Sequence, residues 1–394
     1  MTKNWQELER KYFMPTFKRL PIVLVRGEGV SVWDENDKSY LDMVAGIAVN
    51  VLGHSHPAVV DAINHQAGQL IHVSNLYYST PQLELAELLV ENSCGDKVFF
   101  GNSGAEANEG AIKLARKYGK LHRNGAYEVI SVTGSFHGRT LATIAATGQA
   151  KFQEPFTPMP AGFKNVPFND IDAIKQATTE LTCAVLLECV QGESGVHLAD
   201  PQYLKDLRSW CDEQGLLLIL DEIQTGMGRT GKFLAYENYG IEPDVFTMAK
   251  GLGGGVPIGA IVAKESASCF ALSDHGSTFG GNPLACAAGV ATVNYILENG
   301  IVDNAKQMGD ALLSGLRTMQ AKHSNVREVR GMGLMAALDL QQDKAAQLVE
   351  KALQKGLILN ATGPNTIRMA PALIIGREDV QEAISIIDQV LESL

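Results

Sequence analysis

Short apolar runs alternate with helix-like stretches over the middle of the chain, from residue 97 to about residue 265. Nearly all of these runs are apolar on both faces, which is typical of buried parallel strands. The alternation predicts an α/β fold, in which a doubly wound, mostly parallel sheet lies between helices. The strands are expected at residues 98–100, 127–133, 183–190, 216–220, 244–249 and 259–263.

The two ends of the chain show a different pattern. Residues 1–50 contain two strand-like stretches, IVLVRGEGVSVWD and SYLDMV, whose turns predict a small antiparallel element. Residues 301–394 mix amphipathic helices with the strand-like GLMAALDL and TIRMA, and they end in a helical pattern. We therefore expect both ends to build one smaller α+β domain, beside a large domain over residues 51–300.

Polar or glycine-rich segments follow most of the predicted strands. Open α/β sheets bind their ligands at the carboxyl edge of the strands, so we expect the functional site there. The segments are GNSGAEANE, GSFHGRT, QGESG, DEIQTG and KGLGGG.

Composition narrows the range of partners. The 394 residues include 33 Lys and Arg against 44 Asp and Glu, and the net charge of −11 speaks against nucleic acid or an anionic membrane as the main partner. The longest apolar runs, such as residues 216–220, are far shorter than the ~20 residues that cross a bilayer. The first twenty residues lack an apolar signal-peptide core, and the six cysteines form no C-x-x-C pair. We expect a cytoplasmic protein with reduced thiols.

Lys250 stands at the end of the predicted strand DVFTMAK and is followed by GLGGGVPIG, which contains five glycines. An apolar strand end removes water from the ammonium group and lowers its pKa, which favours the free amine that a Schiff base needs. The glycines would let a planar ligand approach the backbone. A solvated lysine that opens a flexible loop would give the same segment, so this segment alone leaves both interpretations open.

Two glycine-rich segments resemble nucleotide-binding motifs without completing them. The G-x-G-x-x-G pattern fails at Val256, and GMGRTGK at residues 226–232 is followed by Phe233 where a P-loop needs Ser or Thr. GNSGA lacks the last glycine of a G-x-S-x-G elbow, and there is no H-E-x-x-H, so neither a serine hydrolase nor a metal site is expected. A nucleotide-binding protein built on residues 226–232 stays the alternative from another functional class.

The segment after the first predicted strand changes at once to helical spacing, which places Ser103, Gly104 and Ala105 on the first turn of a helix. Such a helix start offers free N–H groups and a positive dipole end to a phosphate. An ordinary N-cap serine would leave the same pattern. The loop at residues 276–283 is rich in small and hydroxyl residues, and it is suited to phosphate contacts or is only a polar turn.

Asp221 ends the apolar run LLLILD, where burying an unpaired carboxylate would be costly. It therefore needs a cationic partner, and a protonated ring nitrogen is one; a helix-capping aspartate is the alternative. Phe136, in GSFHGRT, could stack on an aromatic ring or could belong to the core.

The sequence resembles the pyridoxal-phosphate enzymes of fold type I. The resemblance lies in four features that follow one another along the chain: the helix start, the aromatic residue, the strand-end aspartate and the lysine. The match is close to the class III aminotransferases and runs from about residue 10 to the end of the chain. The segments that resemble the blocks of that family are FFGNSGAEANEGAIKLAR, SFHGRTLATIAATG, LLILDEIQTGMGRTGKFLAYE, PDVFTMAKGLGGGVPIGA and STFGGNPLACAAG.

The resemblance implies roles for individual residues. Lys250 would bind pyridoxal phosphate covalently and then carry a proton between substrate and cofactor. Asp221 would pair with the pyridinium nitrogen, with Glu222 beside it in the same cofactor-binding DE-x-Q segment, and Gln224 would bond the phenolic oxygen. The remaining cofactor contacts would be Phe136 and Ile223 on the two ring faces, Ser103, Gly104 and Ala105 at the phosphate, and Thr278 from a neighbouring subunit of a homodimer.

The resemblance also implies a substrate. Arg368 falls on the arginine that takes the α-carboxylate of glutamate, a task suited to its bidentate fork. Glu193 resembles the acidic gate that covers this arginine when the other substrate is bound. Arg139 and Ser277 match positions that hold N-acetylornithine in acetylornithine aminotransferases, and RLPIVLVRGEGVSVWD, LDMVAGIAVNVLGHSHP and HVSNLYY look most like that subgroup.

This subgroup moves the terminal amine of N2-acetyl-L-ornithine to 2-oxoglutarate, which gives N-acetyl-L-glutamate 5-semialdehyde and L-glutamate in arginine biosynthesis. The resemblance therefore implies this reaction for the chain. The competing activities within the family are transamination of succinyldiaminopimelate, ornithine or 4-aminobutyrate, and an isomerisation of the glutamate-1-semialdehyde aminomutase kind.

Overall fold

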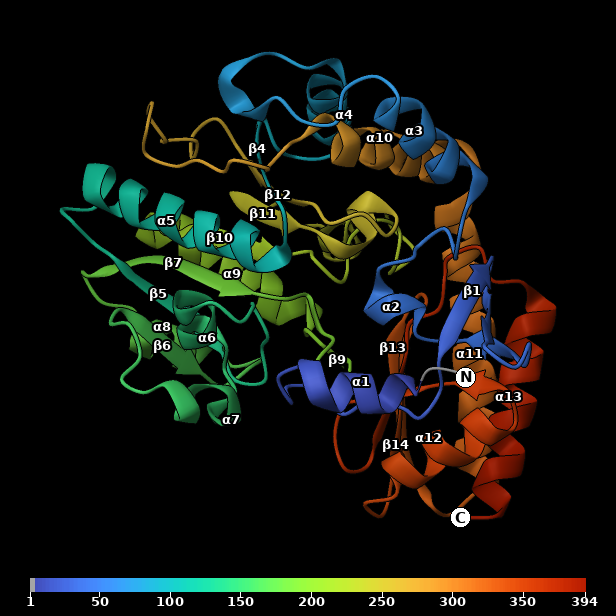
Figure 1. The fold of residues 1–394 in the computed structure, drawn as a ribbon. Helices are drawn as coiled ribbons and strands as arrows, with labels where there is room; N and C mark the ends of the chain where they lie inside the picture. The colour runs from blue at the N-terminus through green and yellow to red at the C-terminus, as the bar shows by residue number, and fades with distance from the viewer. Residues whose placement is uncertain (1–3) are drawn as a thin grey trace.

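A seven-stranded sheet forms the centre of the larger part of the molecule (Figure 1). The computed structural model describes residues 4–394. The strand order is β4–β12–β11–β10–β7–β5–β6, and only β12 runs antiparallel to its neighbours. The strands are β4 (Lys97–Gly101), β5 (Glu128–Val132), β6 (Phe163–Val166), β7 (Thr182–Leu187), β10 (Leu217–Asp221), β11 (Val245–Met248) and β12 (Gly259–Ala263).

The six strands predicted from the apolar runs are all present in this sheet, and the mostly parallel α/β architecture is confirmed. The sequence did not predict β6. This strand lies at the edge of the sheet and reads FKNV, so it lacks the apolar run that marks a buried strand. The run predicted at 183–190 is also shorter than expected: β7 ends at Leu187, and β8 (Val190–Gln191) turns away to pair with β9 (His197–Leu198).

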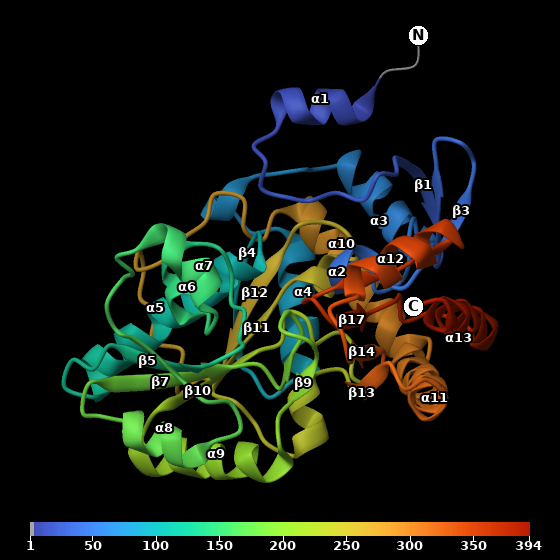
Figure 2. The same ribbon diagram turned by 90° about the horizontal axis from the view of Figure 1, so that it is seen from below.

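Helices cover both faces of the large sheet (Figure 2). On one face lie α5 (Gly104–His122) and α6 (Leu141–Ala146), and on the other lie α8 (Ile171–Ala177) and α9 (Pro201–Gln214). The buried side of α5 carries alanines, which let the helix lie close to the sheet. Its start is capped twice, because Ser103 Oγ accepts a hydrogen bond from the Glu106 N–H at 3.2 Å and the Glu106 carboxylate accepts one from the Asn102 N–H.

The two chain ends share a second body beside the large sheet (Figure 1). β1 (Leu24–Glu28), β2 (Ser31–Asp34) and β3 (Ser39–Asp42) form the expected antiparallel element, and β15 (Leu357–Ile358) extends it by pairing in parallel with β3. The domain limits at residues 50 and 300 stay a prediction. The other elements here are β13 (Val326–Met332), β14 (Met335–Leu340), β16 (Asn360–Ala361), β17 (Thr366–Met369), α11 (Ile301–Lys322), α12 (Ala345–Gln354) and α13 (Arg377–Glu392).

A left-handed turn, α2 (Ala45–Ala48), leads from β3 toward the large sheet. Its four residues all have positive φ, at 49°, 66°, 66° and 60°. Each non-glycine residue in this conformation costs about 1–2 kcal/mol, so the turn needs support. Asp42 provides it, because Oδ1 accepts hydrogen bonds from the N–H groups of Val44 at 2.8 Å and Ala45 at 3.0 Å.

The remaining helices pack around the junction of the two bodies or lie on the surface. α10 packs against α3 and α4. Within residues 4–394, no single helix has the length and apolar character to cross a membrane; only α10 and α11 together pass that test, and they are bent by 69°. These helices are α1 (Trp5–Tyr12), α3 (Pro57–Ala67), α4 (Thr80–Glu91), α7 (Ala150–Gln153) and α10 (Pro283–Glu298), with short 3-10 turns at Ser74–Leu76, Glu154–Phe156, Ala235–Tyr239 and Lys250–Gly253.

Candidate active site

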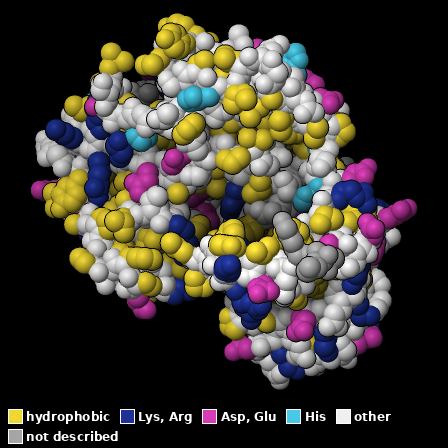
Figure 3. Space-filling model, in the orientation of Figure 1, with side chains coloured by type: hydrophobic (Ala, Val, Ile, Leu, Met, Phe, Trp, Pro, Cys, Tyr) yellow, Lys and Arg dark blue, Asp and Glu magenta, His cyan; other side chains and the backbone are white. Residues whose placement is uncertain are grey.

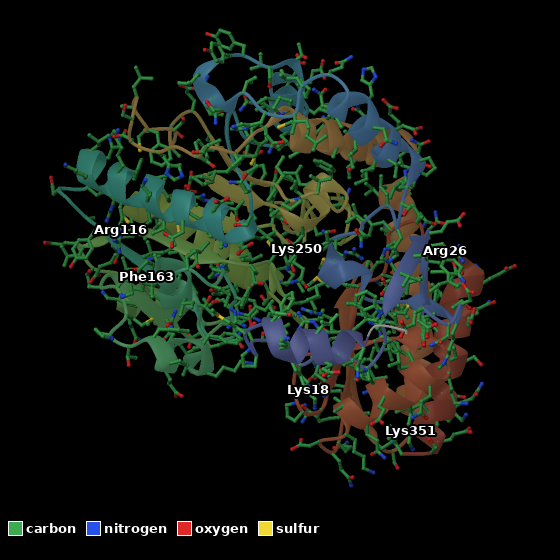
Figure 4. All side chains as sticks on the ribbon, viewed as in Figure 1. Lys18, Arg26, Arg116, Phe163, Lys250 and Lys351 are labelled. Atoms are coloured by element: carbon green, nitrogen blue, oxygen red, sulfur yellow. The ribbon has the colours of Figure 1, made fainter. Side chains whose placement is uncertain are left out.

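The carboxyl ends of five strands meet at one edge of the large sheet, where a cavity of about 430 Å³ opens. Figure 4 places Lys250 here, between the large sheet and the body built from the chain ends, and Figure 3 shows a hollow near the middle of the same face. The lining residues are Val49, Asn102, Ser103, Gly104, Ala105, Phe136, His137, Gly138, Arg139, Glu188, Asp221, Ile223, Gln224, Ala249, Lys250, Gly255, Val256, Pro257 and Ile258.

Asp221 is the last residue of β10, and its side chain is 4% exposed. Its Oδ2 accepts hydrogen bonds from Asn108 Nδ2 at 2.7 Å and pairs with His137 Nδ1 at 2.8 Å. Its Oδ1 accepts a hydrogen bond from the Ile223 N–H at 3.1 Å. The carboxylate is therefore held in one orientation at the wall of the cavity, as a buried charge requires.

His137 and Asn108 are site residues that the sequence did not predict. Asn108 on α5 also donates to the His137 carbonyl at 2.8 Å and accepts from Thr247 Oγ1 on β11 at 2.8 Å, so one amide links three segments around Asp221. The histidine stands next to Phe136 in the GSFHGRT segment, and a polar residue beside a predicted ring-stacking position was the one available signal.

Glu188 is a second buried carboxyl group in the cavity wall, and the sequence did not predict it either. Its Oε2 accepts a hydrogen bond from the Phe136 N–H at 3.1 Å. Burial, followed by the nearby charge of Asp221, raises the pKa of Glu188 well above its ordinary value. The two carboxyl groups therefore differ in their surroundings: Asp221 is bonded by three donors, whereas the surroundings of Glu188 favour its protonated form. An acidic residue inside the apolar run CAVLLECV was the sequence signal.

Lys250 follows β11 and has a φ of 40°, a left-handed conformation that is uncommon for a lysine. Burial lowers the pKa of its ammonium group to about 8, and the nearby positive charge of Arg368 acts in the same direction. Asp221, Glu193 and Glu188 oppose this shift. The free amine is therefore much more available near neutral pH than that of an ordinary lysine, as the strand-end position predicts.

The start of α5 forms one end of the cavity. Ser103 is the N-cap of this helix, and Gly104 and Ala105 are its first two residues. The first N–H groups of a helix have no acceptor within the helix, and they lie at its positive dipole end. A side chain on Gly259 would overlap the Ser103 carbonyl oxygen, so glycine there allows β12 to lie against this helix start.

Most of the other residues expected at the cofactor also line the cavity. Phe136, Ile223 and Gln224 are all in its wall. Glu222 is placed differently, because its carboxylate accepts hydrogen bonds from the Tyr236 N–H at 2.9 Å and Thr225 Oγ1 at 2.5 Å and does not line the cavity. Burial raises its pKa to about 7. Its contacts make Glu222 a support for the segment after β10.

Arg368 lies on β17 in the body built from the chain ends, and it is 2% exposed. Its Nη1 lies 3.1 Å from Glu193 Oε2 and also donates to the Gly192 carbonyl at 3.0 Å and to Gln224 Oε1 at 3.4 Å. Its Nη2 donates to Asn360 Oδ1 at 2.7 Å. Arg368 and Glu193, which the sequence predicts as the carboxylate-binding arginine and its acidic gate, therefore form an ion pair in the structure.

Of three further predicted residues, one lines the cavity and two do not. Arg139 lines it, with the guanidinium carbon 3.9 Å from the ring centre of Phe152. Ser277 Oγ accepts a hydrogen bond from Asn102 Nδ2 at 3.1 Å, and Asn102 is in the cavity wall. Thr278 is exposed and does not line the cavity of its own chain.

The segment GMGRTGK does not form a phosphate loop. Arg229 points into the core, where Nη1 donates to the carbonyls of Leu334 at 2.9 Å and Pro371 at 2.5 Å. Lys232, which would bind phosphate in a P-loop, is exposed. The segment instead joins the large sheet to the C-terminal part of the chain.

Comparison with known proteins identifies the family. The profile of the Aminotransferase class-III family matches residues 12–391. The acetylornithine aminotransferase of Caldanaerobacter subterraneus subsp. tengcongensis is 54% identical over 387 residues, and the match covers 98% of each chain.

The chain is a class-III aminotransferase.

Solved aminotransferases have the same fold. The crystal structure of the ornithine aminotransferase of Toxoplasma gondii ME49 matches with a TM-score of 0.94 and 31% identity, over 99% of this chain and 94% of that one. The acetylornithine aminotransferase of Elizabethkingia anophelis matches over 100% of both chains, with a TM-score of 0.89 and 33% identity. The resemblance in the sequence is thus confirmed for family and fold. Like the family, this aminotransferase uses pyridoxal phosphate.

The cavity of the aminotransferase fits this cofactor on three sides. The fixed carboxylate of Asp221 can face a protonated ring nitrogen, the start of α5 can hold a phosphate, and the amine of Lys250 can bind the aldehyde carbon. These three groups come from β10, α5 and the segment after β11, and they converge on one space.

The lowered pKa of Lys250 predicts how cofactor attachment depends on pH. The rate at which pyridoxal phosphate attaches to the apoprotein should rise through about pH 8 and level off above about pH 9, because the amine is then neutral. In R368Q the midpoint should move to higher pH, because a positive charge that lowers the pKa is gone. Stopped-flow absorbance measures both rates. A wild-type rate that still rises steeply beyond about pH 10 would show an ordinary lysine.

Proposed function

We propose that this aminotransferase moves the terminal amino group of N2-acetyl-L-ornithine to 2-oxoglutarate, giving N-acetyl-L-glutamate 5-semialdehyde and L-glutamate in arginine biosynthesis. The observation that carries this proposal is the ion pair between the buried Arg368 and the half-buried Glu193, near Lys250. Arg368 offers a binding site for the α-carboxylate of glutamate or 2-oxoglutarate. Glu193 can cover this site when acetylornithine binds. The 54% identical relative, which is named for acetylornithine, supports the same substrate.

The residues of the cavity divide the work of holding the cofactor. Asp221 holds a proton on the ring nitrogen, with His137 and Asn108 fixing its carboxylate. Phe136 and Ile223 would pack on the two ring faces. Ser103, Gly104 and Ala105 on the start of α5 would hold the phosphate, and Gln224 would bond the phenolic oxygen. Bound in this way, pyridoxal phosphate supplies an electron sink for the negative charge that develops on the substrate.

Lys250 is the group that moves the proton. Its Nζ would take the proton from the substrate carbon that carries the amine and deliver it to the cofactor carbon that receives the amine. Because burial brings its pKa to about 8, the amine can act as a base and the ammonium as an acid near neutral pH. The raised pKa of Glu188 beside Asp221 disfavours a second negative charge in the cavity.

Arg368 and Glu193 serve the two substrates in turn. Arg368 binds the α-carboxylate of glutamate and 2-oxoglutarate through its planar fork. When acetylornithine binds, its amine is at the end of the chain, and no carboxylate reaches Arg368. Glu193 then covers the guanidinium, as it does at 3.1 Å in this structure. Arg139 and Ser277 hold the distant carboxylate and the acetyl group of acetylornithine.

Ornithine transamination is the strongest competing function, because the Toxoplasma gondii ornithine aminotransferase shares the fold at a TM-score of 0.94. Its identity of 31% is well below the 54% of the acetylornithine relative. Succinyldiaminopimelate and 4-aminobutyrate are the further alternatives. Ornithine and 4-aminobutyrate present a terminal amine, as acetylornithine does, so the difference from them lies in the groups that Arg139 and Ser277 meet. The free amine of succinyldiaminopimelate instead stands beside a carboxylate.

A homodimer completes the site in this proposal. Thr278 is exposed in its own chain, and apolar side chains near it are also exposed, including Tyr78 at 93% and Phe279 at 61%. The two segments that carry them are joined, because Asn75 Nδ2 donates to the carbonyls of Ser277 and Gly280. Hydrophobic side chains also gather at the top of Figure 3, around the loop before α4. Such a surface is typical of an interface, and a second copy would bring Thr278 to its neighbour's phosphate.

We also infer that the reaction takes place in the cytoplasm. The six cysteines are all free thiols, and four of them are buried. Unpaired thiols fit a reducing compartment.

Substrate comparison tests the proposed reaction. With 2-oxoglutarate as acceptor, kcat/KM for acetylornithine should exceed that for ornithine and for 4-aminobutyrate by roughly tenfold or more, because the cavity residues would contact the carboxylate and acyl group together. Succinyldiaminopimelate should be measured alongside them, and K250A should be inactive with all four. Equal or better activity on ornithine or 4-aminobutyrate would contradict the assignment.

Sedimentation tests whether two copies of the chain form a dimer that completes the active site. The wild type should sediment at twice the chain mass of 42.4 kDa, and Y78D should sediment as a monomer that loses pyridoxal phosphate, because a charge would then be buried in the interface. L181D is the control, since Leu181 is also exposed but lies at the start of β7, away from the cavity edge. A monomeric wild type that keeps its cofactor would overturn the shared site.

A further inference from the structure

The loop between β8 and β9 carries Glu193 and is held by two arginines from the body built of the chain ends. At its first residue, the Gly192 carbonyl accepts a hydrogen bond from Arg368 Nη1 at 3.0 Å. At its far side, the Gly195 carbonyl accepts one from Arg330 Nε at 2.8 Å. Glu193 therefore lies between two anchors that both belong to another body of the protein.

Arg330 is itself rigidly placed. Its side chain is 11% exposed, and it makes a bidentate pair with Asp339, with Nη1 and Nη2 lying 2.9 and 3.0 Å from the two carboxylate oxygens. Asp339 is nearly fully buried on β14, which pairs with β13, the strand of Arg330, and with β17, the strand of Arg368. Both anchors of the loop thus come from one sheet, and their spacing is fixed.

Gly195 lets the loop approach Arg330 closely. Its φ is +123°, a conformation that side chains rarely adopt, and a Cβ there would lie 3.0 Å from Arg330 Nη2 and 3.3 Å from the Thr366 methyl carbon. Any larger residue would push the loop away from the guanidinium. The glycine and the arginine therefore act together to place the segment that carries Glu193.

One side of the loop faces a second cavity. A separate cavity of about 770 Å³ is lined by Ser194, His197 and Arg330, together with residues of β13 and α11. The loop consequently has open space into which it can move. The loop is held by its hydrogen bonds to the two arginines and by Val196, which is fully buried against Met335 and Ala337.

We propose that Arg330 is a positioning residue that holds Glu193 on Arg368, and that it thereby sets the balance between the terminal-amine substrate and the dicarboxylate substrate. This inference rests on the proposed alternation of Glu193 at Arg368. Without the Arg330 anchor, Glu193 leaves Arg368 more often. The exposed guanidinium then binds dicarboxylates more tightly, and the terminal-amine substrate is selected less well.

The variant R330Q tests this role, and R327Q is its matched control. Arg327 lies on the same strand and bonds the same carboxylate, with Nη2 at 2.8 Å from Asp339 Oδ2, but it is half exposed and is not bonded to Gly195. The loss of one positioning hydrogen bond should tighten the binding of glutarate, an unreactive dicarboxylate, to the holoenzyme by about two- to tenfold. The ratio of kcat/KM for acetylornithine to that for glutamate should fall by a similar factor, and R327Q should change neither.

Two further measurements separate positioning from a general loss of structure. In R330K, which keeps a charge for Asp339 but not the fork, both quantities should move in the same direction as in R330Q. In the E193Q background, R330Q should have no further effect on glutarate binding, because the gate through which it acts is already disabled. Hydrogen exchange of the peptide over residues 190–198 should be faster in R330Q and unchanged in R327Q.

The result that overturns the proposal is unchanged glutarate binding in R330Q and R330K, or an equal effect of R330Q with and without E193Q. A loss of thermal stability with proportional losses in both half-reactions would also overturn it. These outcomes are distinct from failure of the proposed function, which would appear in the wild type as poor turnover of acetylornithine.

Discussion

The active site depends on a carboxylate that is buried at the end of a strand. Asp221 closes β10, where water is excluded, and its charge is tolerated because Asn108, His137 and the Ile223 N–H all bond it. These contacts tie α5, the segment after β5 and the end of β10 to one point. The start of α5 and the amine of Lys250 then lie at fixed positions around the same cavity. A cofactor bound there meets a negative charge, a helix start and a nucleophile at once.

The same low-water environment gives Lys250 and Glu188 their chemistry. Burial lowers the pKa of the lysine to about 8 and raises the pKa of the glutamate, so both groups are uncharged more often than they would be in water. The carboxylate of Asp221 is instead bonded by three donors. One site thus contains a fixed carboxylate, a carboxyl group whose pKa is raised and an amine whose pKa is lowered, each set by its immediate contacts.

The sequence predicted the parts whose signals are local. Apolar runs predicted six strands, and the switch to helical spacing after residue 101 predicted the α5 start. Positions at or after strand ends made Lys250, Asp221 and Phe136 candidates, and the resemblance to the family supplied their expected roles. The strand β6 was not predicted, because its position at the edge of the sheet leaves its sequence half polar. The sequence also did not predict three site residues, because their hydrogen-bond partners are 29 to 113 residues away; these are His137, Asn108 and Glu188. Arg330 and Gly195 are 135 residues apart, and only the folded sheet brings them together. Glu222 was predicted at the cofactor because it belongs to the DE-x-Q segment, but its side chain does not line the cavity.

The central claim is that Asp221 keeps a proton on the ring nitrogen of the bound cofactor. The 15N chemical shift of that nitrogen, in holoenzyme loaded with labelled pyridoxal phosphate, measures this directly in the wild type and in D221N. The wild-type nitrogen should be protonated from about pH 6 to about pH 9, and the D221N nitrogen should be unprotonated over the same range. An unprotonated nitrogen in the wild type, or an unchanged shift in D221N, would contradict the account.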